Sequence, residues 1–103
     1  MSLGCSNPYI INNLPNSIEE LKFNIFFDLE LDNLPNSIKK ILFHFESDYN
    51  KELNNLPKSL EYLELNENFD KNIFNIPSNL LTIKCSEKYK YINNFNEFNI
   101  ITY

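Results

Sequence analysis

The chain has 103 residues and a formal charge of −5, from 14 acidic residues against nine basic ones, all of them lysines. Hydrophobic residues make up 43% and aromatic residues 15% of the sequence, which excludes an intrinsically disordered chain. The acidic balance and the lack of arginine argue against a nucleic-acid partner, because phosphate binding depends on clustered positive charge. At this length we expect one domain.

The scarcity of glycine and cysteine excludes several classes of binding site. Gly4 is the only glycine, which excludes the glycine-rich loops that bind phosphates and dinucleotides. Cys5 and Cys85 do not form a metal-binding or redox spacing. We therefore expect no metal and no cofactor.

The start of the chain, "MSLGCSNP", lacks the apolar segment of a signal peptide. No apolar run approaches the roughly 20 residues that are needed to cross a bilayer, and the 19 asparagines include no Asn-x-Ser/Thr sequon. We expect an intracellular, cytoplasmic protein without a membrane partner. Residues 1–8 are expected to form an N-terminal extension, whose "MSLG" resembles an expression remnant.

A repeat begins after this extension. The letters "NLPNSI" occur at residues 13–18 and again at 33–38, with near-copies "NLPKSL" at 55–60 and "NIPSNL" at 75–80. The apolar residues that precede the prolines are spaced by 20, 22 and 20 positions, and they are Leu14, Leu34, Leu56 and Ile76. A degraded fifth copy, "YINNFN", has Asn96 in the place of the proline.

Apolar residues follow each copy at I-x-x-L-x-F spacing. They are Ile18/Leu21/Phe23, Ile38/Ile41/Phe43, Leu60/Leu63/Leu65 and Leu80/Ile83/Cys85. The alternation of apolar and polar residues predicts short strands at residues 20–24, 40–44, 62–66 and 82–86, and a fifth begins at 100–103. A fixed period of this length is typical of a leucine-rich-repeat solenoid, in which equivalent residues of successive coils stack.

The repeated letters are explained as a corner that every coil must turn. Proline lacks an N–H group and has a fixed φ, so it ends sheet pairing before the chain turns toward the strand. The asparagine two residues earlier can bond turn backbone and form a ladder between coils. The serine two residues after the proline can serve in the same way.

The remaining segments, "FDLELD", "DYNKEL" and "FDKNIF", are too short and polar for helices. The prediction is therefore a leucine-rich-repeat solenoid that is mostly β. A short parallel sheet forms its concave face, and extended or 3₁₀ turns form its convex face, with little or no α-helix. Residues 9–103 are expected to hold about four complete repeats of 20–22 residues and a partial terminal repeat.

The repeat resembles the FNIP-type leucine-rich repeat. It follows the pattern aromatic–Asn/Asp–x–x–Leu/Ile–x–Asn–Leu–Pro–x–Ser–Leu/Ile–x–x–Leu/Ile, and "YNKELNNLPKSLEYLEL" at 49–65 is the best copy. Such proteins are typical of amoebae and of the large DNA viruses that infect them, which implies host cytoplasm if the protein is viral. The resemblance implies an interaction module and supplies no catalytic residues.

The outward positions of the strands are expected to line the concave surface. Their columns are Glu20/Lys40/Tyr62/Thr82, Lys22/Leu42/Glu64/Lys84 and Asn24/His44/Asn66/Ser86. The candidate partner-binding residues are Lys22, Leu42, His44, Tyr62, Glu64 and Lys84, because exposed aromatic and aliphatic side chains among charges can anchor a partner. The alternative is that these side chains only pack along the sheet and set its register.

The predicted function is non-enzymatic presentation of side chains to a protein or peptide on a rigid scaffold. His44 is the only histidine, and no nucleophile or carboxylate is arranged with it for catalysis. One alternative is the substrate-recognition fragment of a larger F-box (ubiquitin ligase) or kinase-linked protein. Another is a structural filler without a partner. An open terminal strand edge further predicts self-association.

Overall fold

The computed structural model describes residues 1–3 and 8–103. Gly4 and Cys5, which entered the sequence argument, lie outside the described residues, as does part of the expected extension. The elements in chain order are β1 (Ser2–Leu3), α1 (Pro8–Ile11), β2 (Glu20–Phe23), β3 (Lys40–Phe43), β4 (Tyr62–Glu64), β5 (Thr82–Cys85), η1 (Ile92–Phe95) and β6 (Asn99–Thr102). No helix in this described part of the chain is long and apolar enough to span a membrane.

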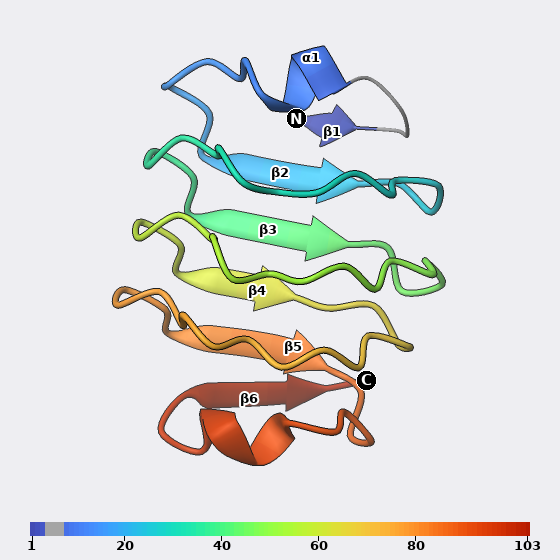
Figure 1. Cartoon of the computed structure of the whole chain (residues 1–103). Helices are drawn as coiled ribbons and strands as arrows, with labels where there is room; N and C mark the ends of the chain where they lie inside the picture. Colours follow the sequence, from blue (N-terminus) through green and yellow to red (C-terminus); the bar gives the residue numbers. More distant parts are fainter. Residues whose placement is uncertain (4–7) are drawn as a thin grey trace.

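The strands form one parallel sheet in chain order, from β1 to β6 (Figure 1). Glu20 lies opposite Lys40, Lys40 opposite Tyr62, and Tyr62 opposite Thr82. These pairs have the sequence spacing of the repeat, so equivalent letters of successive copies are neighbours in space. The predicted mostly β, leucine-rich-repeat-like solenoid is confirmed.

The core consists of stacked apolar columns. Leu21, Ile41, Leu63 and Ile83, one from the middle of each of the strands β2 to β5, all have 0% exposure. Three further columns are also largely buried: Phe23/Phe43/Leu65/Cys85, Phe27/Tyr49/Phe69/Tyr89 and Leu31/Leu53/Ile73. Burying one such side chain contributes about 1.5–3 kcal/mol, and a single coil cannot cover both of its faces. Stacking therefore supplies the stability of each coil.

The proline corners have the role that the repeat predicts. In all four, the proline carbonyl accepts a hydrogen bond from the N–H group three residues later, at 3.1–3.4 Å, in Ile18, Ile38, Leu60 and Leu80. The hydroxyls of Ser37 and Ser59 donate to backbone carbonyls of the preceding coil, each at 2.6 Å. The repeated serine therefore binds one coil to the next.

The ends of the stack differ from the repeats between them. Near the N-terminus, the backbone N–H of Lys22 donates to the carbonyl of Met1 at 2.8 Å, next to β1. In the degraded fifth copy, η1 replaces the proline corner, and Phe95 is buried there. Proline disfavours helical geometry in the residue before it. Since Asn96 stands in its place, residues 92–95 can form a 3₁₀-helix.

Candidate functional site

The candidate surface is the outward face of the parallel sheet. In β2 and β5, residues that point into the core alternate with exposed or half-buried ones, as a pleated strand requires. Lys22, Leu42, Glu64 and Lys84 are successive register neighbours, and Tyr62 occupies the adjacent column. Five of the six candidate residues therefore lie on one face, in two neighbouring columns.

Two of these candidates contact each other directly. The phenol of Tyr62 donates a hydrogen bond to Oε1 of Glu64 at 3.1 Å. Burial raises the pKa of Tyr62, and its bond to the Glu64 carboxylate raises the pKa further. The phenol therefore stays protonated at neutral pH and holds the carboxylate in place, since a neutral O–H group can donate to it.

Two aromatic residues that the sequence reasoning did not select complete this surface. The rings of Phe45 and Tyr103 meet edge to face, with centroids 4.6 Å apart. The Nζ atom of Lys84 lies 5.5 Å from the centroid of the Tyr103 ring, within the range of a cation–π contact. Burial raises the pKa of Tyr103, and the negative charge of Glu64 adds to this effect. We call the surface formed by Leu42, Phe45, Tyr62, Glu64, Lys84 and Tyr103 the sheet-face patch.

The sequence pattern could have predicted the position of Tyr103 but not that of Phe45. Tyr103 lies two residues after Ile101, which pairs with Lys84, so strand alternation puts both on the same face. Phe45 follows the strand in a turn, where alternation no longer applies. Its ring contact depends on tertiary structure, which a period-two pattern does not predict.

The third column that was predicted to point outward, Asn24/His44/Asn66/Ser86, lies where the strands end and the turns begin. Side-chain acceptors of Asn24, His44 and Ser86 each take a hydrogen bond from the N–H group two residues later, at 2.9–3.1 Å. For His44 this acceptor is Nδ1, so one ring nitrogen is already used within its own turn. Such side-chain caps stabilise local turns.

The expectation that Asn66 points outward is wrong. Asn66 is only 1% exposed, and its Nδ2 donates to the carbonyls of Ser47 and Tyr49 at 2.7 and 2.9 Å. These carbonyls belong to the turn after β3, which is two residues longer than the turn after β2. The physical reason for the burial is that the longer turn presents acceptors that only a side chain from the next coil reaches.

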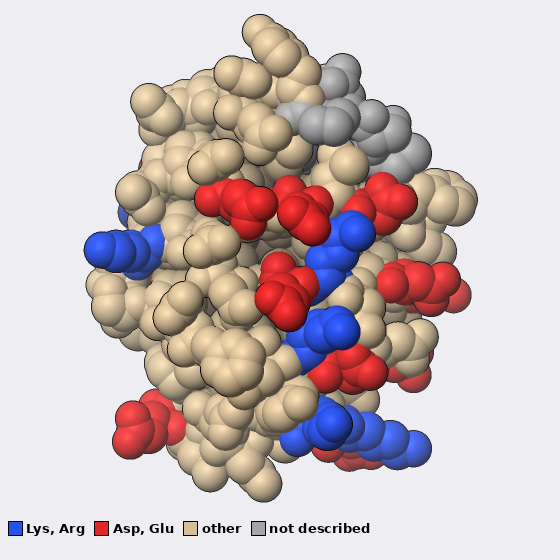
Figure 2. Space-filling view, in the orientation of Figure 1, with Lys and Arg blue, Asp and Glu red and all other residues tan. Residues whose placement is uncertain are grey.

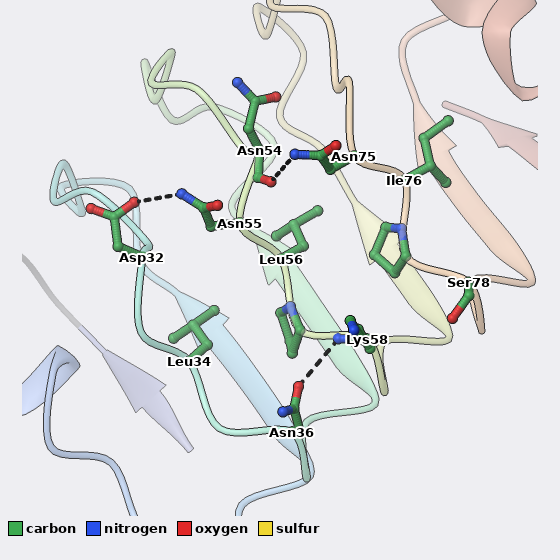
Figure 3. A pocket seen from close by; sticks show the side chains of 12 residues that line it. Asp32, Leu34, Asn36, Asn54, Asn55, Leu56, Lys58, Asn75, Ile76 and Ser78 are labelled. Carbon is green, nitrogen blue, oxygen red and sulfur yellow. Dashed lines mark hydrogen bonds between the residues drawn. The ribbon is translucent and has the colours of Figure 1, made fainter.

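A groove of about 740 Å³ runs along the proline corners (Figure 3). Leu34, Leu56 and Ile76 line it, together with a row of asparagines. Asn55 donates to Asp32 at 3.1 Å and Asn75 donates to the Asn54 carbonyl at 3.0 Å, each reaching the preceding coil. Two of the four repeated asparagines thus link their coil to the preceding one, but their partners are Asp32 and a backbone carbonyl rather than the equivalent asparagine of that coil.

Among the described residues, no group of three or more His, Cys, Asp or Glu side chains could hold a metal ion. Cys85 is a buried free thiol in the core column, and burial raises its pKa, which makes it a poor nucleophile. The described surface offers hydrogen-bonding, charged and aromatic groups in fixed positions.

Comparison with known families agrees with the repeat. A family model described as FNIP Repeat matches residues 6–46 and 28–68, two overlapping segments that together cover more than half of the chain. No curated protein and no solved structure matches the sequence.

Proposed function

The chain belongs to the FNIP repeat family, and from this premise we propose that it is a non-enzymatic protein-interaction module. In this proposal the sheet-face patch binds a protein or peptide partner. The stacked coils act as the scaffold that holds the patch side chains in place. The scaffold does no chemistry on the partner.

The observation that carries this proposal is the composition of the sheet-face patch. Three aromatic rings, one aliphatic side chain and one charge of each sign lie together on a face supported by the core columns below it. Aromatic anchors surrounded by polar groups are the usual energetic centre of protein interfaces. Because Tyr62 holds Glu64, and Lys84 lies over Tyr103, less side-chain freedom is lost when a partner binds.

The proposal is tested by identifying a partner through affinity capture and then measuring the dissociation constant for purified variants. A Leu42→Ala/Tyr62→Ala variant is expected to raise Kd at least about tenfold, since truncated anchors typically cost more than 1 kcal/mol each. Phe74→Ala is the matched control, because Phe74 is 74% exposed and lies outside the patch. Equal Kd values for the two variants would remove the sheet-face patch from consideration.

Self-association through β6 is a separate part of the proposal. Within the described residues, β6 pairs only with β5, so its outer edge has free backbone groups. Asn99 donates its N–H to Leu81 in the direction of β5. By strand alternation the N–H of Thr102 points to the outer edge.

The variant Thr102→Pro removes this outward N–H group while leaving the bonds to β5 in place. Light scattering over a wide concentration range is expected to show dimers for the wild type and for Thr102→Ser, and monomers for Thr102→Pro. A wild type that stays monomeric throughout would overturn this part of the proposal.

A further inference from the structure

The turns that follow β2, β3 and β4 carry an unbalanced charge. Their residues, 24–28, 44–50 and 66–70, include five carboxylates and no lysine: Asp28, Glu46, Asp48, Glu67 and Asp70. These turns lie along one edge of the stack, at the right in Figure 1. Figure 2 shows acidic groups on that side of the molecular surface, with lysine side chains among them.

Four of these carboxylates are exposed and form no side-chain hydrogen bond or ion pair within the described part of the chain. The side chains of Asp28, Glu46, Asp48 and Glu67 make no hydrogen bond or ion pair with any described residue, whereas Asp70 accepts one from Asn50. Neighbouring coils of a parallel sheet are about 4.8 Å apart, so these carboxylates lie along the same edge of the stack. Exposed carboxylates without an ion-pair partner can pair with a cationic group of a bound partner.

Exposed apolar side chains accompany the charges. Phe26 is 70% exposed, and Ile25 beside it is also exposed. Both line a cleft of about 420 Å³ between the first and second of these turns. Asp28 and Asp48 line the same cleft, and Lys51 is its one cationic residue. We call Ile25, Phe26, Asp28, Glu46, Asp48 and Glu67 the acidic edge.

The cleft has its origin in the unequal length of the two turns. The first turn reaches its buried aromatic residue, Phe27, three positions after Asn24, while the second reaches Tyr49 five positions after His44. Both aromatic rings are buried and stack with centroids 5.8 Å apart. The longer turn must therefore leave the path of the shorter one before it returns to the same column, and the cleft lies between the two.

We propose that the acidic edge binds a basic segment of a partner protein, with a lysine or arginine side chain in the cleft and apolar side chains on Phe26. The aliphatic stem of such a side chain can cover the exposed ring while its charged group meets the carboxylates. This surface lies beside the sheet-face patch and involves other side chains, so the inference goes beyond the proposed function. Charge complementarity selects the partner class, since these carboxylates would repel an acidic segment.

The test uses a fluorescein-labelled peptide that alternates lysine and leucine, with fluorescence anisotropy as the measurement. Asp28→Asn/Asp48→Asn is expected to weaken binding at least about fivefold, and Phe26→Ser to a similar extent. Two controls are matched. Glu19→Gln/Glu61→Gln removes the same charge at the opposite ends of the strands, and Phe74→Ser removes an equally exposed ring elsewhere.

Weakening by the edge variants, with both controls within about twofold of the wild type, supports the proposal. Equal weakening by both charge variants would overturn it, because binding would then follow net charge alone. Absence of binding to the wild type would also overturn it, as would equal binding of a peptide that alternates glutamate and leucine. All substituted positions of the edge are exposed, and thermal melts by circular dichroism verify that each variant is folded.

Discussion

The turns after β2 and β3 both connect the end of a strand to a buried aromatic residue, but they differ in length. In both, a side chain at the strand end caps the N–H group two residues later, and the backbone turn closes three residues later, at Phe27 and at Ser47. In the shorter turn the closing residue is the aromatic ring of the core column. In the longer turn Ser47 is buried at this position, and Tyr49 supplies the ring.

The two additional residues bury main-chain groups that the shorter turn does not have. The Ser47 hydroxyl accepts the N–H of Tyr49 at 3.0 Å, and Asn66 of the next coil donates to the carbonyls of both residues. Buried backbone groups need such partners because leaving them unpaired costs free energy. The stack therefore tolerates an insertion where the neighbouring coil supplies the missing donor.

The largest loss of stability is expected at Phe43, where the longer turn after β3 packs against the core. The Phe43 ring lies 5.0 Å from that of Phe23 and 4.5 Å from that of Tyr49, between centroids. Phe43→Ala should lower the free energy of unfolding by about 3–5 kcal/mol, as measured by urea denaturation. Cys85→Ala, in the same column, should cost less than half as much because its side chain is smaller. Equal losses would contradict the role of the aromatic cluster.

Asn66→Ala should cost about 2–4 kcal/mol, because two buried carbonyls lose their donor. Asn24 occupies the equivalent column position in the regular coil but is exposed. Asn24→Ala should therefore cost about 1 kcal/mol or less. If the two substitutions destabilise the protein equally, Asn66 has no special part in holding the longer turn.

The next largest loss of stability is expected in the buried column Phe27/Tyr49/Phe69/Tyr89. The phenol of Tyr49 donates to the Leu29 carbonyl at 2.9 Å, and that of Tyr89 donates to the Lys71 carbonyl at 2.6 Å. Each of Tyr49→Phe and Tyr89→Phe should lower the free energy of unfolding by about 0.5–1.5 kcal/mol. We expect both variants to lose a similar free energy of unfolding, because Tyr49 and Tyr89 occupy equivalent positions in the aromatic column although their turns differ in length.

The same tyrosines predict alkaline sensitivity. Burial raises the pKa of both phenols, so the folded state favours their protonated forms. The two phenols stabilise the folded state fully at a pH below the unfolded-state tyrosine pKa of about 10. This stabilisation is lost as the pH rises above that value. The fall in melting temperature between pH 9 and pH 11 should be smaller for Tyr49→Phe/Tyr89→Phe than for the wild type. An identical fall would show that these phenols do not titrate on unfolding.

The smallest expected effect concerns the caps that the two turns share. His44→Ala removes the acceptor for the Glu46 N–H group, which is exposed to water. The loss should be below about 1 kcal/mol, comparable to Asn24→Ala, because water can replace an exposed cap. A much larger loss in urea denaturation would mean that His44 has a second structural role.

Much of the fold follows from residues that repeat. The spacing of Leu21, Ile41, Leu63 and Ile83 predicts their common register, since only residues that stack are constrained to match. The same register brings Lys22, Leu42, Glu64 and Lys84 into one row. Periodicity cannot predict features that occur once. The burial of Asn66 depends on an insertion in another coil, and η1 depends on a missing proline.

The candidate site shows the same limit. Alternation along a strand predicts which side chains face outward, and with the register it puts Lys22, Leu42, Glu64 and Lys84 in one row beside Tyr62. It does not predict that Tyr103 reaches the ring of Phe45, because that contact joins residues 58 positions apart, counted as 103 − 45. Nor does it predict the cleft of the acidic edge, which arises from the difference between two turns.

A double-mutant cycle gives the most direct test of the compensation between Asn66 and the longer turn. Deleting Ser47 and Asp48 gives the second coil the length of the first, and Asn66→Ala is then measured by urea denaturation with and without this deletion. Asn66→Ala should cost about 2–4 kcal/mol in the parent chain and less than about 1 kcal/mol in the shortened one. An equal cost in both chains would contradict the compensation.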